Sequence, residues 1–148
     1  MQDKRKKLIS LLFNTGRAMK EHFHDEKKAK ISLLHMETLG YVLEHEKPSM
    51  KHIADHLCIT PASTSSLADG LVEEGFLERL LEKEDRRVVK LQITPKGKEF
   101  FKKGMEHANE KMETVFEGLD DDEIEFFIHI LEKFIKIISN KKTDNKSK

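Results

Sequence analysis

The chain has 148 residues with 27 basic and 27 acidic side chains, so its formal net charge is zero. That length suits one domain with its own core. Hydrophobic residues make up 37% of the chain and charged residues 36%, a composition that is too polar for a membrane protein and more apolar than that of a disordered chain. The single cysteine excludes an internal disulfide and any metal cluster held by several thiolates.

The sequence lacks the signatures of an enzyme, a nucleotide-binding loop or an exported protein. Its seven glycines are too scattered for a phosphate-binding loop, and neither HExxH nor GxSxG occurs. There is no run of about 18 apolar residues and no cleavable leader, which predicts a cytoplasmic protein. We therefore expect no enzymatic activity, no cofactor and no membrane contact.

Charge is unevenly distributed along the chain. Residues 1–30 hold nine Lys and Arg against four Asp and Glu, a net charge of +5. The last ten residues hold four Lys against one Asp, a net charge of +3, so the middle carries a net charge of −8. Any basic surface that attracts nucleic acid has to be local.

Two amphipathic helices are predicted before the first proline. Apolar side chains recur three and four positions apart over residues 3–24, and a second helix is predicted over about residues 32–44. Pro48 marks the end of the second helix, because a residue that precedes proline disfavours the helical backbone.

A short helix is predicted over residues 50–57 and a second helix over residues 61–74, with a tight turn between them. Ser49 caps the first of them. Thr60 and Pro61 start the second, as a capping hydroxyl followed by proline at a position where its missing N–H would be unpaired anyway. Two helices joined in this way are typical of a helix-turn-helix.

The second helix of this motif presents small polar side chains away from its apolar face. Serine is a poor choice inside a helix, so an outward cluster of serines predicts contact with a polar partner such as phosphates and base edges. A merely solvated face is the alternative. The predicted DNA-binding residues on and just before this helix are Thr60, Ala62, Ser63, Ser65 and Ser66.

A hairpin is predicted next, from two strands over about residues 76–81 and 89–93. The run between them, residues 82–87, is entirely charged. Arg86 and Arg87 in this tip suit the narrow minor groove of A·T-rich DNA. A charged tip that only aids solubility is the alternative.

Two long helices are predicted at the C-terminal end, over residues 95–117 and about 120–138. The last helix is apolar around more of its circumference than one core contact requires. This predicts that it pairs with its copy in a homodimer, the alternative being a helix buried within a monomer. Residues 140–148 are polar and lysine-rich and are predicted to form a disordered tail.

Residues 59–100 resemble the winged helix-turn-helix of the multiple antibiotic resistance regulator (MarR) family. The motifs that carry the resemblance are Leu71, Gly75 and Arg79, then Asp85 and Arg87, then the run LQITPKG at 91–97. The resemblance extends over nearly the whole chain. It implies one domain over 1–139, mainly α with a small β-hairpin wing, in which a winged helix-turn-helix at about 48–94 is flanked by terminal dimerisation helices at about 3–24 and 95–138.

The resemblance also implies a function. Members of the family are dimeric transcription regulators, in which the second helix of the motif enters the major groove of double-stranded DNA and the wing reaches the minor groove. By analogy, Asp85 orients Arg87 and Arg79 braces the hairpin. A repressor that binds a palindromic operator and is released by a small-molecule effector is the implied activity. The rival hypothesis is a winged-helix module for protein–protein assembly without specific DNA binding, which the neutral charge favours.

Four further side chains carry predictions of their own. Cys58, in the turn of the motif, is predicted to be a small buried hydrophobe and not a redox switch. Asp69 is predicted to pair with a nearby arginine in preference to contacting cytosine. His52 and His56 are four residues apart, and a pair is too few ligands to predict a metal site.

Overall fold

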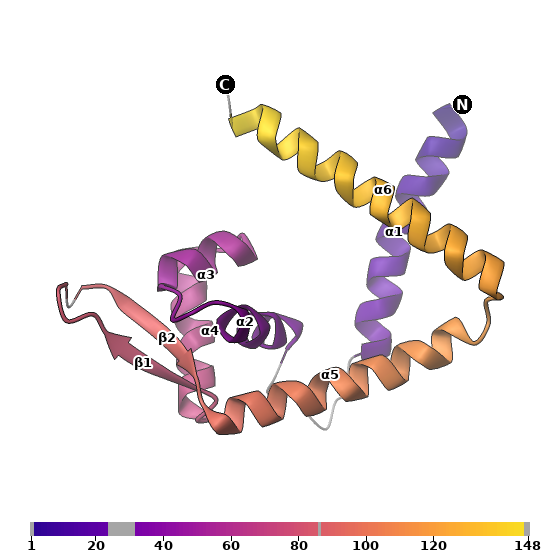
Figure 1. Ribbon diagram of the computed structural model, residues 1–148. Coiled ribbons are helices and arrows are strands. Elements are labelled where there is room, and N and C mark those ends of the chain that lie inside the picture. The colour runs from indigo at the N-terminus through magenta and orange to yellow at the C-terminus, as the bar shows by residue number, and fades with distance from the viewer. Residues whose placement is uncertain (1, 24–31, 86, 147–148) are drawn as a thin grey trace. The chain divides into compact units, whose positions relative to one another are not determined.

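The computed structural model describes residues 2–23, 32–85 and 87–146, which form six helices and two strands (Figure 1). In chain order these are α1 (Gln2–Phe23), α2 (Leu33–Glu44), α3 (Met50–Leu57), α4 (Pro61–Glu73), β1 (Leu77–Leu81), β2 (Val89–Ile93), α5 (Pro95–Phe116) and α6 (Asp121–Lys146). The mainly helical winged fold is therefore confirmed. Contacts divide the chain into two compact units, residues 1–108 and 109–148.

The core of the first unit joins the helix-turn-helix to the hairpin. Each of the elements α2, α3, α4, β1 and β2 contributes one leucine or isoleucine whose exposed fraction is 2% or less. Burial of each such side chain contributes roughly 1.5–3 kcal/mol, so the five elements form one cooperative lobe. The five side chains are Leu39, Ile53, Leu71, Leu77 and Leu91.

The hairpin is antiparallel, and its register places Leu77 opposite Ile93 and Leu81 opposite Val89. The loop before α3 adds a third edge, because the Leu91 N–H donates to the Pro48 carbonyl over 3.0 Å and the next residue, Ser49, forms a bridge with β2. This edge ties the start of the helix-turn-helix directly to the wing.

The helix starts predicted from hydroxyl and carboxylate caps are confirmed. The Thr60 hydroxyl accepts from the Ser63 N–H over 3.2 Å at the start of α4. At the start of α5, the Thr94 hydroxyl accepts from the Gly97 N–H over 3.0 Å. The same hydroxyl donates to the Gly75 carbonyl over 2.7 Å. In this way the start of α5 is fixed to the end of α4.

Gly97 lies where α5 passes closest to the segment before β1. A Cβ at this buried position would overlap the Phe76 carbonyl oxygen and would lie 2.9 Å from Cγ1 of Ile93. Both atoms belong to the packed lobe, and a backbone oxygen cannot rotate away as a flexible side chain can. This close approach is the reason for a glycine here.

We expect Gly97→Ala to lower the free energy of unfolding by about 2–3 kcal/mol, because overpacking a tight site forces backbone shifts. Urea unfolding measures the change. Gly70→Ala is the matched control, since a Cβ there would lie at an ordinary 3.6 Å from Nε2 of His35, and alanine in a helix should gain about 0.5–1 kcal/mol. Equal effects of the two substitutions would contradict the steric explanation.

The second unit consists of the end of α5 and the whole of α6. The predicted capping box starts α6: the Glu123 N–H donates to Asp120 over 2.9 Å, and the Asp120 N–H donates to Glu123 over 3.1 Å. None of the described helices is long and apolar enough to cross a membrane.

In the structure α6 continues past Ile138 to Lys146, and the disordered tail over residues 140–148 stays a prediction. Neither glycine nor proline follows Gly118, so nothing in the sequence terminates the helix. Lysine is also a good helix former, and its charge is favourable near the negative end of the helix dipole.

Candidate nucleic-acid interface

The turn of the helix-turn-helix is built around a left-handed residue. α3 ends at Leu57, and Cys58 adopts φ of 54° and ψ of 40° while its N–H donates to the Ala54 carbonyl. The Ile59 N–H donates to the same carbonyl over 3.2 Å. This reversal of the chain allows α4 to begin at Pro61, three residues after Cys58.

α4 presents the small polar face that the sequence predicts. Thr64, Ala68 and Leu71 are buried against the lobe. The predicted contact residues lie on the other side and are all exposed: Thr60, Ala62, Ser63, Ser65 and Ser66. The hydroxyl of Thr60 is engaged by the cap, because it accepts from the Ser63 N–H and donates to the Ser63 hydroxyl over 2.9 Å.

Asp69 and Arg79 form an ion pair between α4, the second helix of the helix-turn-helix, and the hairpin wing. The guanidinium Nη2 of Arg79, on β1, donates to Oδ1 of Asp69, on α4, over 2.5 Å. The predicted pairing of Asp69 with an arginine is thus confirmed. Both side chains are well exposed, so the pair contributes only about 0–1 kcal/mol to stability, but it links the orientation of the hairpin to that of α4.

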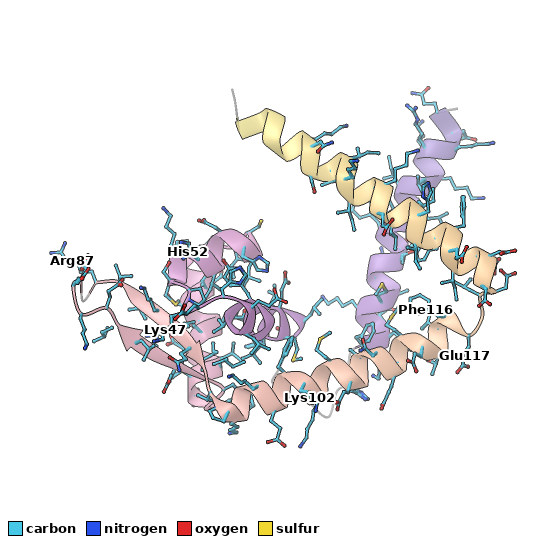
Figure 2. The ribbon with its side chains drawn as sticks, in the orientation of Figure 1. Lys47, His52, Arg87, Lys102, Phe116 and Glu117 are labelled. Carbon is cyan, nitrogen blue, oxygen red and sulfur yellow. The ribbon has the colours of Figure 1, made fainter. Side chains whose placement is uncertain are left out.

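The wing turn is held by Asp85 through the main chain. Its carboxylate accepts from the backbone N–H of Arg87 over 2.9 Å, and its carbonyl accepts from the Val88 N–H over 3.0 Å. The resemblance implies that Asp85 orients Arg87. In the structure the hydrogen bond between the two residues is made to the Arg87 backbone N–H. Figure 2 shows Arg87 at the far end of the hairpin. Arg86 lies outside the described residues.

The positive charge of this lobe is confined to a small part of it. Residues 48–94 contain six Lys and Arg and eight Asp and Glu, a net charge of −2. On β2, Lys90 is neutralised by Glu82, whose Oε1 lies 2.6 Å from Nζ. The concentration of positive charge within the lobe is at the tip, where Arg86 and Arg87 are adjacent in the sequence. Attraction to phosphates is therefore expected to centre on the wing.

The prediction that Cys58 is buried is wrong, because its side chain is exposed. The reason is the left-handed backbone, which turns the side chain away from the lobe at the end of α3. Its thiol lies 3.6 Å from the Asp55 carbonyl. Whether the thiol responds to oxidants is a separate matter, and its redox inertness stays a prediction.

We expect Cys58→Gly to raise the free energy of unfolding by up to ~1 kcal/mol. A left-handed backbone costs other residues roughly 1–2 kcal/mol, and the greater chain entropy of glycine offsets about 0.5–1 kcal/mol of the gain. Thermal unfolding checks this. Cys58→Ser is the control, since serine keeps the strain and should leave both stability and DNA affinity nearly unchanged. A loss of stability in the glycine variant would contradict the expectation.

An aromatic stack that sequence reasoning missed lies between α2 and α3. The rings of His45 and His56 stack on Tyr41 at centroid distances of 3.9 and 4.2 Å, on opposite faces because both cannot share one. His56 Nε2 also lies 3.6 Å from a carboxylate oxygen of Glu37. The i, i+4 spacing of Tyr41 and His45 was the available signal. Within the described residues, no group of three or more potential ligands is arranged for a metal ion.

The helix-turn-helix, the hairpin that follows it and the exposed face of α4 define a winged-helix protein of the DNA-binding type. A model of the MarR family matches residues 31–89. The HTH-type transcriptional repressor YetL of Bacillus subtilis is 27% identical over 132 residues, which cover 84% of this chain and 76% of YetL. The uncharacterized regulator YpoP of the same organism is 30% identical over 104 residues, which cover 67% of this chain and 71% of YpoP.

A solved structure has a similar fold. Streptococcus pneumoniae FabT, in complex with DNA, matches 95% of this chain and 99% of its own with a TM-score of 0.70, at 20% identity. The chain belongs to the MarR family of transcription regulators.

Proposed function

We propose that the protein is a homodimeric repressor that binds a palindromic operator in double-stranded DNA and is released by a small-molecule effector. It acts in the cytoplasm, where that DNA is located. The observation that carries the proposal is the pairing of an exposed, small polar face on α4 with an arginine-tipped hairpin on the same lobe. Repression is supported by the similarity to YetL, and effector control rests on the family resemblance alone.

Each part of the lobe receives a role in this proposal. The serine face of α4 enters the major groove, where Ala62 lies against a thymine methyl and Ser63, Ser65 and Ser66 contact base edges or phosphates. The wing arginines, Arg86 and Arg87, enter the adjacent minor groove. Three side chains hold these contact surfaces in place. Thr60 caps α4, Arg79 ties the hairpin to α4 through Asp69, and Asp85 holds the turn of the wing. FabT, which has a similar fold, was solved in complex with DNA.

The homodimer is proposed from the exposed apolar surface of the terminal helices. In α6 the apolar residues form two adjacent stripes with alternating spacings of three and four, which is the pattern of helix–helix seams. One stripe is Ile124, Ile128, Leu131, Ile135 and Ile138, and the other is Phe127, Ile130, Phe134 and Ile137. Apart from Ile124, each of these side chains is exposed by 41–62% in the single chain. Apolar faces this large are normally covered by a partner.

Selection from fragmented genomic DNA tests the proposed function. The purified protein should retain a small set of fragments that share a palindrome, with half-sites about one helical turn apart. Binding to that palindrome should weaken steeply with salt. An assembly module would enrich no sequence and show no salt-sensitive binding, and that result would replace the proposal with the rival function.

A further inference from the structure

The two helices that support α4 start with the same unusual cap. Ser32 and His35 begin α2, and Ser49 and His52 begin α3, each as a Ser-x-x-His sequence. Nδ1 of His35 accepts from the Ser32 N–H over 3.1 Å and lies 2.8 Å from the Ser32 hydroxyl. Nδ1 of His52 faces the Ser49 N–H at 3.4 Å, and the Ser49 hydroxyl accepts from the His52 N–H over 3.3 Å.

Histidine here occupies the position that glutamate or glutamine takes in an ordinary capping box. An imidazole nitrogen can accept a hydrogen bond only while it is unprotonated, and imidazole ordinarily titrates near pH 6.5. Protonation turns the acceptor into a donor and also places a positive charge at a helix N-terminus, where the helix dipole repels it. Both effects weaken the start of the helix, whereas a glutamine cap would be unaffected at the same pH.

The rings are connected to the recognition helix. Nε2 of His35 lies near Gly70 of α4, where an added Cβ would be 3.6 Å away, in ordinary van der Waals contact. α3 packs on α4 through Ile53, which is fully buried in the same core as Leu71. Loosening the first turn of α2 or α3 therefore removes support from the helix that presents Ser63 and Ser66.

The sign of the effect follows for His35. Burial of the ring is the cause that lowers the pKa of His35 below 6.5, so the folded lobe resists protonation more than the unfolded chain does. The stabilisation is complete above the unfolded pKa and is lost as the pH falls through the folded pKa. Acidification below about pH 6.5 therefore destabilises the lobe through this residue.

Other charged groups lie on α2, α3 and the elements that contact them. Those on neighbouring turns of elements packed near His35 are Asp69, Glu73 and Glu74 on α4 and Glu99, Lys103 and His107 on α5. On α3 and the elements that contact it they are Glu37 on α2, Lys47 before α3, Lys51, Asp55 and His56 on α3, and Lys90 on β2. Nε2 of His56 lies 3.6 Å from a carboxylate oxygen of Glu37.

We propose that the two Ser-x-x-His boxes make the DNA-binding lobe pH-sensitive, so that acidification loosens α2 and α3 and weakens operator binding. This inference concerns regulation and rests on the proposed function for its DNA-binding part. Its structural part, the loss of lobe stability on acidification, stands independently of DNA.

The test compares the natural protein with the His35→Gln, His52→Gln double variant at about pH 8 and about pH 5.5. Glutamine keeps the acceptor at both pH values. Between them the natural protein should lose roughly fivefold in its folding equilibrium for each box, the value of one helix cap, and a similar factor in operator affinity. The double variant should lose far less in both. Urea unfolding and fluorescence anisotropy at constant ionic strength measure the two quantities.

The matched control is the His45→Gln, His56→Gln variant, which removes two histidines of the same lobe that belong to neither Ser-x-x-His box. It should keep the acid sensitivity of the natural protein. Equal acid sensitivity in the natural protein and in the His35→Gln, His52→Gln variant would overturn the proposal. Acid loss of stability that leaves operator affinity unchanged would overturn its regulatory part. Absence of operator binding at every pH, with the stability result as expected, would remove the proposed function and leave the cap effect.

A measurement on the natural protein covers the case in which the double variant fails to fold. The backbone amide signals of Ser32 and Ser49 should shift in an NMR titration with the same midpoints as the ring signals of His35 and His52. Amide signals that stay constant while the rings titrate would show that the caps do not depend on imidazole, and the proposal would fall.

Discussion

A chain that ends at Leu119 should be monomeric and should lose specific operator binding. The truncation removes α6, whose two apolar stripes lie exposed in the single chain. Half-sites one helical turn apart, about 34–36 Å, require two linked recognition helices. Without the link, binding becomes that of one lobe to one half-site, and we expect operator affinity to fall roughly 100-fold or more. Light scattering gives the mass, and fluorescence anisotropy gives the affinity.

The truncated chain should keep its folded lobe, because the fully buried side chains of the core all lie between Thr38 and Leu91. Circular dichroism and urea unfolding check this point. A chain that ends at Asn140 is the matched control: it loses the terminal lysines but keeps both apolar stripes, so it should remain dimeric. A monomeric mass for the intact chain at micromolar concentration would contradict the dimer, and operator binding by the shorter chain at full affinity would separate dimerisation from recognition.

The parts of the fold that the sequence predicts are those fixed by local chemistry. Thr60 with Pro61 and Asp120 with Glu123 start helices in the structure as expected, because a cap is satisfied within four residues of chain. The pairing of Asp69 with Arg79 was also predictable once a wing follows the recognition helix. In each case the required partner is near in sequence or is fixed by the order of elements.

The errors arise where the outcome depends on backbone conformation or on contacts between distant residues. Cys58 has the composition of a core residue, but its left-handed backbone turns it to solvent. The sequence places His56 one turn after His52, yet in the structure His56 stacks on Tyr41, fifteen positions before it, because α2 and α3 pack together. The end of α6 lies beyond Ile138, because an uninterrupted helix continues through polar residues until something stops it.

Changing Arg86 and Arg87 together to alanine should weaken operator binding severely and flatten its salt dependence. Arg87 lies at the end of a wing whose lobe is otherwise slightly acidic. Each arginine–phosphate contact releases condensed counterions and contributes about −0.9 to the slope of log affinity against log salt. We therefore expect the slope to fall by up to about two per subunit. Fluorescence anisotropy at several salt concentrations, on operator and on scrambled duplex, measures both effects.

Substitutions on α4 separate the two kinds of contact. Ser63→Ala or Ser66→Ala should cost about 1 kcal/mol in operator binding and change which bases are tolerated, while the salt slope stays nearly the same, because a neutral hydroxyl releases no counterion. The arginine variant should instead lose affinity for operator and scrambled duplex alike. If that double variant keeps both its affinity and its slope, the wing does not touch DNA, and the serine face of α4 would have to supply recognition in a lobe with a net charge of −2 over residues 48–94.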